Sequence, residues 1–127
     1  MGFIEKVYHV AVEATLDVIG GKWKPIILCH LGEGAMRTSE LSRAIPNVSQ
    51  RVLTKQLREL EKDYIIKRKV YNQVPPKVEY SLTDEGRSLR KILVAMSNWG
   101  NARVAKAQKE GKNVKILNPS SRGFLKM

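Results

Sequence analysis

The spacing of apolar and polar positions predicts one long amphipathic helix over about residues 49–63. At 100° per residue, one narrow stripe of this helix carries only leucines, namely Leu53, Leu57 and Leu60. We expect this stripe to pack against the rest of the domain. The opposite side is polar and mainly cationic, with Arg51, Thr54, Lys55, Arg58 and Lys62. Asn47 or Ser49 is expected to cap the helix by accepting a bond from a free backbone N–H.

Three shorter helices are predicted ahead of this one. Apolar residues recur at helical spacing from Ile4 to Ile19, and two consecutive glycines then end that helix. A second helix is expected to start near Lys24-Pro25, because proline is tolerated in a first turn, and to stop by Gly32–Gly34. Thr38 or Ser39 is expected to cap a short third helix.

The period of the pattern changes to two after the long helix. Residues 66–71 and 78–82 alternate in the way that predicts two β-strands. Pro75 and Pro76 between them cannot donate ladder hydrogen bonds, so this stretch is predicted to form the tip of a hairpin. Met36-Arg37 is compatible with a single β-bridge. Thr83 is expected to cap a last helix that stops near Gly111.

The order of these elements predicts a mainly α (α+β) winged helix-turn-helix domain. A short helix, a tight turn at residues 45–47 and a longer cationic helix make the helix-turn-helix, and the hairpin that follows is the wing. The wing sheet is expected to have two or three strands. We predict one domain over residues 1–111 and a basic, flexible tail over residues 112–127.

The charge of the chain is concentrated in its second half. The formal net charge is +11, of which residues 1–63 supply +1 and residues 64–127 supply +10. Such an excess favours an anionic partner such as nucleic acid or an anionic membrane surface, or else a solvated tail. The chain shows no signal-peptide segment and no apolar run of membrane-spanning length, so we expect a cytoplasmic protein without a membrane partner.

A winged helix-turn-helix with these charges predicts which residues bind double-stranded DNA. The start of the long helix is expected to reach base edges and its later turns to reach phosphate, through Ser49, Gln50, Arg51, Thr54, Lys55 and Arg58. The wing would contribute Lys69, Asn72, Gln73 and Lys77. Thr38 and Ser39 would offer hydroxyl and backbone N–H groups to phosphate.

Three stretches form a distinctive set: residues 16–24 (LDVIGGKWK), 53–61 (LTKQLRELE) and 74–83 (VPPKVEYSLT), and Trp99-Gly100 fits with them. Together they resemble a known family, the HxlR-type branch of the MarR-like winged-helix regulators. The resemblance runs from about Glu13 to Gly100. It implies a bacterial transcriptional regulator that acts as a homodimer through its first and last helices. The interface candidates that this implies are Val7, Leu16, Leu93, Met96 and Trp99.

The chain departs from that family at one position. Many members carry a redox-sensing cysteine followed by proline just ahead of the first motif, and Val10 and Ala11 stand there instead. The single cysteine, Cys29, lies among apolar residues of the second predicted helix, so it is expected to be a small buried hydrophobe. One cysteine also excludes an intrachain disulfide.

Other functions are less compatible with the sequence. His9, His30 and Cys29 form no zinc-binding spacing, and the chain lacks a phosphate loop and a nucleophile elbow, so we predict no enzyme, metal or cofactor. A winged-helix protein-interaction module and an RNA-binding module stay as alternatives. A small-molecule effector is expected in principle, but the sequence identifies none. Two-fold symmetry predicts a near-palindromic DNA operator.

Overall fold

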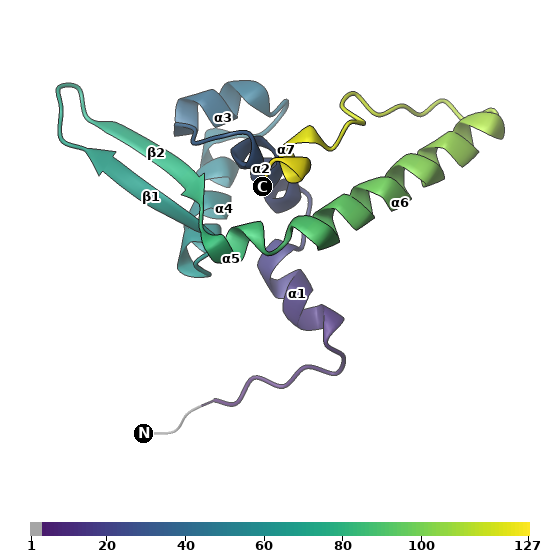
Figure 1. Cartoon of the computed structure of the whole chain (residues 1–127), viewed down its shortest axis with the longest axis horizontal. Helices are drawn as coiled ribbons and strands as arrows, with labels where there is room; N and C mark the ends of the chain where they lie inside the picture. Colours follow the sequence, from purple (N-terminus) through teal and green to yellow (C-terminus); the bar gives the residue numbers. More distant parts are fainter. Residues whose placement is uncertain (1–3) are drawn as a thin grey trace.

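A computed structural model describes residues 4–127 and places a small helical body between a hairpin and a long helix, which project to opposite sides (Figure 1). The elements are α1 (Val12–Ile19), α2 (Trp23–Gly32), α3 (Thr38–Ala44), α4 (Gln50–Lys62), β1 (Ile66–Tyr71), β2 (Lys77–Leu82), α5 (Asp84–Arg87), α6 (Arg90–Lys109) and α7 (Arg122–Leu125). This order confirms the mainly helical winged helix-turn-helix prediction.

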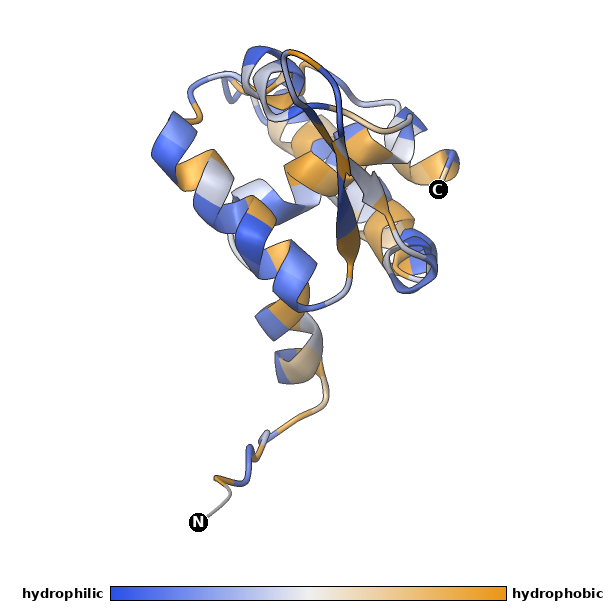
Figure 2. Ribbon diagram, turned by 90° about the vertical axis from the view of Figure 1, so that its left-hand side faces the viewer, coloured by the Kyte–Doolittle hydropathy of each residue, from blue (hydrophilic) through white to orange (hydrophobic). Residues whose placement is uncertain are grey.

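The core is built around α2, which contacts α3, α4, β2 and α7. The leucine stripe of α4 lies in this core, since Leu53, Leu57 and Leu60 are each exposed by 1% or less. Hydrophobic positions gather where the helices face one another, and hydrophilic positions turn outward (Figure 2). The predicted amphipathic character of α4 is therefore confirmed, and burial of this stripe fixes which side of the helix faces solvent.

The wing is a two-stranded antiparallel sheet whose register runs from Ile66 opposite Leu82 to Tyr71 opposite Lys77. Met36 extends it by one isolated bridge to Tyr80, with N–O distances of 3.0 and 2.8 Å. The predicted hairpin is confirmed, and Met36 forms the single bridge with which the sequence is compatible. The bridge joins the base of the wing to the segment that leads into α3, so the wing has a fixed position beside the helix-turn-helix.

The first helix is shorter than predicted, because α1 begins at Val12 and not at Ile4. The carboxylate of Glu13 accepts a bond from the Val10 N–H at 2.6 Å, which satisfies a donor at the start of α1. Ile4 and Val7 are largely exposed in the protomer. Among residues 4–127 no apolar surface covers that face, so the helical spacing alone does not give a helix there.

The caps of α3 and α4 differ in how well the sequence predicted them. Ser49 caps α4 by accepting a bond from the Val52 N–H at 3.1 Å, as expected. Asn47 instead makes the turn, with a φ of 67°. The predicted cap of α3 is wrong, because Thr38 is already the first helical residue. At that end Glu40 accepts from the Arg37 N–H at 2.9 Å, so a side chain inside the helix satisfies the donor.

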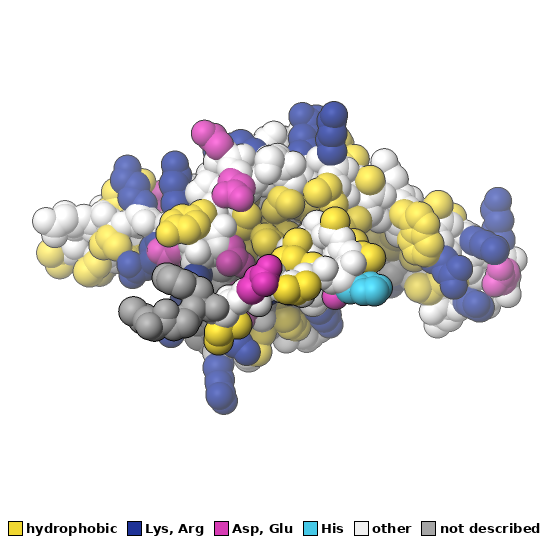
Figure 3. All heavy atoms as spheres, turned by 90° about the horizontal axis from the view of Figure 1, so that it is seen from below, with side chains coloured by type: hydrophobic (Ala, Val, Ile, Leu, Met, Phe, Trp, Pro, Cys, Tyr) yellow, Lys and Arg dark blue, Asp and Glu magenta, His cyan; other side chains and the backbone are white. Residues whose placement is uncertain are grey.

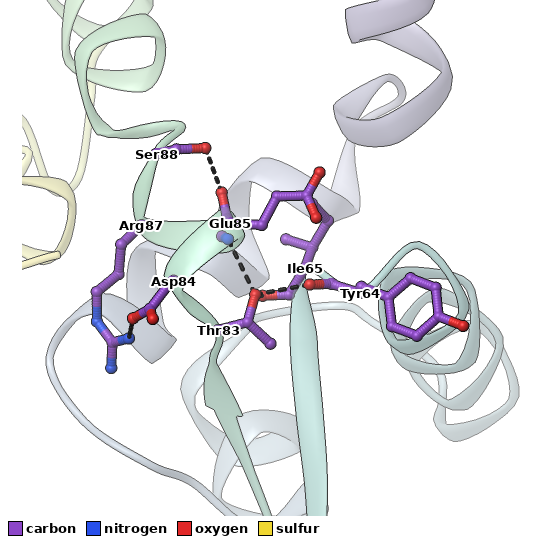
Figure 4. A network of polar contacts seen from close by, with 8 residues as sticks. Tyr64, Ile65, Thr83, Asp84, Glu85, Arg87 and Ser88 are labelled. Carbon is purple, nitrogen blue, oxygen red and sulfur yellow. Dashed lines mark hydrogen bonds and ion pairs between the residues drawn. The ribbon is translucent and has the colours of Figure 1, made fainter.

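The last predicted helix is divided into α5 and α6 at residues 88–89. Gly86 lies so close to β1 that a Cβ there would stand 2.2 Å from the Ile65 carbonyl oxygen. Thr83 fixes this approach (Figure 4): its hydroxyl oxygen lies 2.6 Å from the Tyr64 carbonyl oxygen and accepts from the Gly86 N–H at 3.0 Å. One hydroxyl therefore ties the end of α4 to the start of α5.

Replacing Thr83 by valine should lower the free energy of unfolding by about 1–2 kcal/mol, because the cap of α5 is lost and the shape of the side chain is kept. Urea unfolding of the purified protein measures the change. Thr15→Val is the matched control, since Thr15 on α1 makes no side-chain hydrogen bond within residues 4–127. Equal destabilisation by the two variants would contradict the role given to Thr83.

The end of the chain differs from the loose tail that the sequence predicts. Helix α7 packs on α2, and Phe124 is only 7% exposed. Gly32 and Gly123 allow the two backbones to touch, since a Cβ on Gly32 would stand 1.9 Å from the Gly123 carbonyl oxygen. Arg122 adds an ion pair with Glu33 at 3.1 Å. The last residues therefore belong to the folded body.

Candidate nucleic-acid interface

The outer face of α4 carries a row of exposed cations. Because the leucine stripe is buried, the opposite side must face solvent, and it presents Arg51, Lys55, Arg58 and Lys62. Ser49 and Gln50 are exposed at the start of the same helix, and Thr54 is half-buried beside them. The structure thus brings all the side chains predicted on the recognition helix to one helix, with the charged ones freely accessible.

An ion pair between a buried lysine and a partly exposed glutamate joins α4 to α2. The ammonium of Lys24 lies 3.1 Å from the Glu59 carboxylate, and Lys24 is only 8% exposed. Glu59 is thereby paired with a cation of α2. The sequence analysis missed this pair, because helical periodicity shows that Glu59 is polar but cannot show which residue of another helix it meets.

One face of the wing combines three lysines with a single acid. Antiparallel register places Lys67 opposite Ser81, Lys69 opposite Glu79 and Tyr71 opposite Lys77, and alternation puts all six side chains on the same face. The ammonium groups of Lys69 and Lys77 lie 4.7 and 4.8 Å from the centre of the Tyr71 ring. Asn72 and Gln73 are exposed at the hairpin tip.

Glu79 partly neutralises this face. The Tyr71 hydroxyl donates to the Glu79 carboxylate at 2.9 Å, and Lys77 lies 3.2 Å from its other oxygen. The Tyr71 hydrogen bond, with a further contribution from Lys77, holds the pKa of Glu79 below its usual range. Glu79 is therefore ionised at neutral pH, and Lys77 is a paired cation.

A groove of about 300 Å³ separates the wing from the start of α3. It brings together two predicted contact residues, Ser39 and Lys77, and Thr38 does not line it. Two cations that the sequence analysis left out, Arg37 and Arg43, line the same groove. They could have been suspected because Arg37 precedes the first helix of the helix-turn-helix and Arg43 lies in its last turn, although only the fold shows that they line a groove beside the wing.

Removing the cation of Lys77 should weaken binding to all duplex DNA alike and flatten the dependence of log affinity on log salt by about one unit. Glu79→Gln should instead strengthen binding to all duplex DNA, because it releases Lys77 and removes a negative charge from the same face. Fluorescence anisotropy at several salt concentrations measures both. Lys115→Ala, in the exposed tail, is the control. A Lys77→Ala loss confined to one DNA sequence would contradict a backbone contact.

The residues predicted for a dimer interface divide into two groups. Val7, Leu16, Met96 and Trp99 are exposed, and Trp99 is 69% accessible despite its size. Leu93 is 1% exposed and belongs to the core of the protomer, so its prediction as an interface residue is wrong. It lies on the side of α6 that faces the body, which the apolar spacing of the helix alone does not distinguish from the outward side.

Cys29 is half-buried, and it lies beneath α7. Burial raises the pKa of its thiol, although backbone hydrogen bonds from Gly123 and Phe124 work in the opposite sense. The thiol is therefore protonated at neutral pH and a poor nucleophile. Val10, which stands where the resemblance would place a sensor cysteine, is exposed on the segment before α1.

The fold and the exposed cationic helix define the class of this protein: it is a winged helix-turn-helix, DNA-binding transcription regulator. The chain belongs to the HxlR-like helix-turn-helix family, whose model matches residues 18–108. Within residues 4–127, none of the helices is both long and apolar enough to span a bilayer.

Individual relatives agree with this assignment. The chain is 62% identical over 96 residues to the uncharacterized HTH-type transcriptional regulator YtcD of Bacillus subtilis (strain 168), covering 76% of each chain. The crystal structure of ytcD superposes with a TM-score of 0.72 over 76% of this chain and 98% of that one, at 59% identity. The reduced form of the redox regulator HypR gives a TM-score of 0.74 at 52% identity, covering 79% and 99%.

Proposed function

We propose that this protein binds a specific double-stranded DNA operator as a homodimer, with α4 in the major groove and the wing on the backbone or in the adjoining minor groove. The observation that carries the proposal is the accessibility of Arg51, Lys55 and Arg58 on the side of α4 opposite the buried leucines. A B-form major groove is about 12 Å wide and admits one helix. Cations packed inside the protomer would have excluded this function.

The first half of α4 supports readout of bases. In helix-turn-helix proteins this end of the recognition helix enters the groove. Arg51 has the geometry to donate two bonds to guanine O6 and N7, and Gln50 can bond adenine N6 and N7. Arg58, two turns further along, and the cations of the groove beside Ser39 are placed for phosphate, which positions the domain without reading sequence.

An apolar surface on α1 and α6 supports the homodimer. Figure 3 shows hydrophobic side chains gathered near the middle of the face seen from below, between cationic groups at both ends. Ile92, Met96 and Trp99 fall on one side of α6 and are all exposed, as are Val12 and Leu16 on α1. Contiguous exposed apolar residues of this kind mark interaction sites. A two-fold dimer would bind half-sites about one helical turn apart or a multiple of it.

Placing a charge in this surface should separate the protomers. Trp99→Glu should weaken self-association at least about tenfold, because a carboxylate would be desolvated in the interface, and affinity for a two-half-site operator should fall with it. Sedimentation equilibrium measures the oligomeric state. Asn98→Glu adds the same charge on a different side of α6 and should leave the dimer intact. A Trp99→Glu protein that remains fully dimeric would contradict this interface.

Three further properties follow from the proposed role. We infer a cytoplasmic protein, since the DNA of a bacterium lies in the cytoplasm, and a protein that is not an enzyme. The names of its relatives describe regulators, which supports the second inference. The expected small-molecule effector stays a prediction.

Selection of bound sequences from a pool of random duplexes tests the proposed function. We expect an enriched near-palindromic motif, whose affinity falls steeply with salt. Mobility shifts should then rank the selected duplex above a scrambled duplex, and both above duplex RNA, whose narrow major groove excludes a helix. Equal binding to all three would reject sequence-specific DNA recognition.

A further inference from the structure

A cavity of about 250 Å³ lies between α6 and the segment that leads into α7. Its walls include Val104 and Asn101 from α6, Ile116, Pro119 and Phe124 from the C-terminal segment, and Cys29 from α2. These residues come from three parts of the chain, so the cavity exists only when the C-terminal segment is folded back. The segment lies outside residues 18–108, which match the family model.

Polar contacts hold the C-terminal segment over the cavity. The Gln108 side chain donates to the Val114 carbonyl oxygen at 2.9 Å, and Asn101 donates to the Pro119 carbonyl oxygen at 3.0 Å. Arg122 pairs with Glu33 beyond it. The segment is thus attached at both ends and along its length, and it bridges the space below without filling it.

The cavity faces away from the proposed dimer surface. At 100° per residue, the α6 side chains that line it, Ser97, Asn101 and Val104, are centred about 140° around the helix from Ile92, Met96 and Trp99. Pairing of two protomers through Trp99 would therefore leave the cavity open. A second copy of the chain is not the occupant that this geometry suggests.

The lining indicates the chemistry of an occupant. Among residues 4–127, no charged side chain lines the cavity, and aliphatic, aromatic and thiol groups make up most of its walls. An anion or cation would lose its hydration there without a partner, which is costly. A dry apolar cavity of about 150 Å³ is large enough to bind benzene, so 250 Å³ accommodates a somewhat larger uncharged molecule.

We propose that this cavity is a binding site for a small, uncharged, mainly apolar molecule of about the size of a two-ring aromatic compound. Such a ligand would contact α6, the C-terminal segment and Cys29 at once. Binding at this site does not require DNA, so it is tested apart from the proposed regulatory function, and either can fail without the other.

Calorimetric titration of the full-length protein with indole tests the site, with toluene as a second neutral probe and benzoate as the charged one. We expect the neutral probes to bind at millimolar concentration or below, and benzoate to bind at least about tenfold more weakly. Val104→Phe should weaken indole binding about tenfold or more by filling the cavity. Ile116→Phe should fill the cavity from the opposite wall and weaken indole binding in the same way. It serves as the second variant if Val104→Phe folds poorly.

Val114→Phe is the matched control, because Val114 lies in the same segment but does not line the cavity; it should bind indole within about twofold of the unaltered protein. A second readout locates the probe: saturating indole should slow the alkylation of Cys29 by iodoacetamide several-fold. The proposal is overturned if neither neutral probe binds, if Val104→Phe and Val114→Phe bind alike, or if indole leaves the alkylation rate unchanged.

Discussion

Replacing Arg51 by alanine should cost about 1–3 kcal/mol of binding free energy on the selected operator and relax the preference at one base pair. The expected loss follows from the position of Arg51 on α4. Arg51 lies in the first turns of α4, is exposed, and is separated from the buried leucine stripe, so its truncation removes a contact without disturbing the core. Affinities for the operator and for its single-base variants, measured at one fixed salt concentration, give both quantities.

Lys62→Ala is the matched control for this variant. Lys62 is an exposed cation on the same helix, but it lies in the last turn, where we expect it to contact phosphate and not bases. It should weaken binding to selected and scrambled duplexes equally and should lower the salt slope. If Arg51→Ala behaved in the same way, with equal losses on every sequence, Arg51 would be a backbone contact, and base reading would belong to other residues.

Local periodicity accounts for what the sequence predicted correctly. Leu53, Leu57 and Leu60 at helical spacing define α4 and its buried side, and the alternation after Ile65 defines the wing. Both patterns depend on neighbours a few residues away, which the sequence displays directly. The accessible cations of the recognition helix follow from the same pattern, because a helix with one buried side must present the other.

Contacts between distant segments account for what the sequence could not predict. Lys24 meets Glu59 across two helices, and Arg43 faces Lys77 across a groove, although neither pair has a marker along the chain. Leu93 looks like its exposed neighbours on α6 and is nevertheless a core residue, because the direction in which α6 leaves the wing decides which side is covered.

The C-terminal segment is a second region whose long-range contacts the sequence could not predict. Its composition of Lys, Asn, Pro, Ser and Gly resembles a loose linker, yet Phe124 is buried and α7 packs on α2. The close approach of Gly32 and Gly123 makes this packing possible. No feature of the sequence shows that these two glycines lie against each other. Composition averages over a segment, whereas the attachment of its end depends on particular residues such as Phe124.

Truncation of a residue in the leucine stripe of α4 should have the largest effect on the free energy of unfolding. Leu57→Ala should lower the free energy of unfolding by about 2–5 kcal/mol, because Leu57 is 1% exposed and its removal leaves a cavity under α4. Domains are typically stable by about 5–15 kcal/mol, so this is a large share of the total. Urea unfolding followed by circular dichroism measures it, and Leu117→Ala, the same change at an exposed tail position, should alter stability by less than about 0.5 kcal/mol.

The comparison of Leu57→Ala with Arg51→Ala separates the two sides of one helix. The first variant should lose DNA binding only as far as its folded fraction falls, and binding should return when the protein is stabilised by an osmolyte such as sucrose. The second should unfold normally and bind weakly under every condition. If sucrose restored DNA binding by the Arg51→Ala protein as well, the outer face of α4 would serve folding. The division of α4 into a buried leucine stripe and a DNA-reading surface would then be wrong.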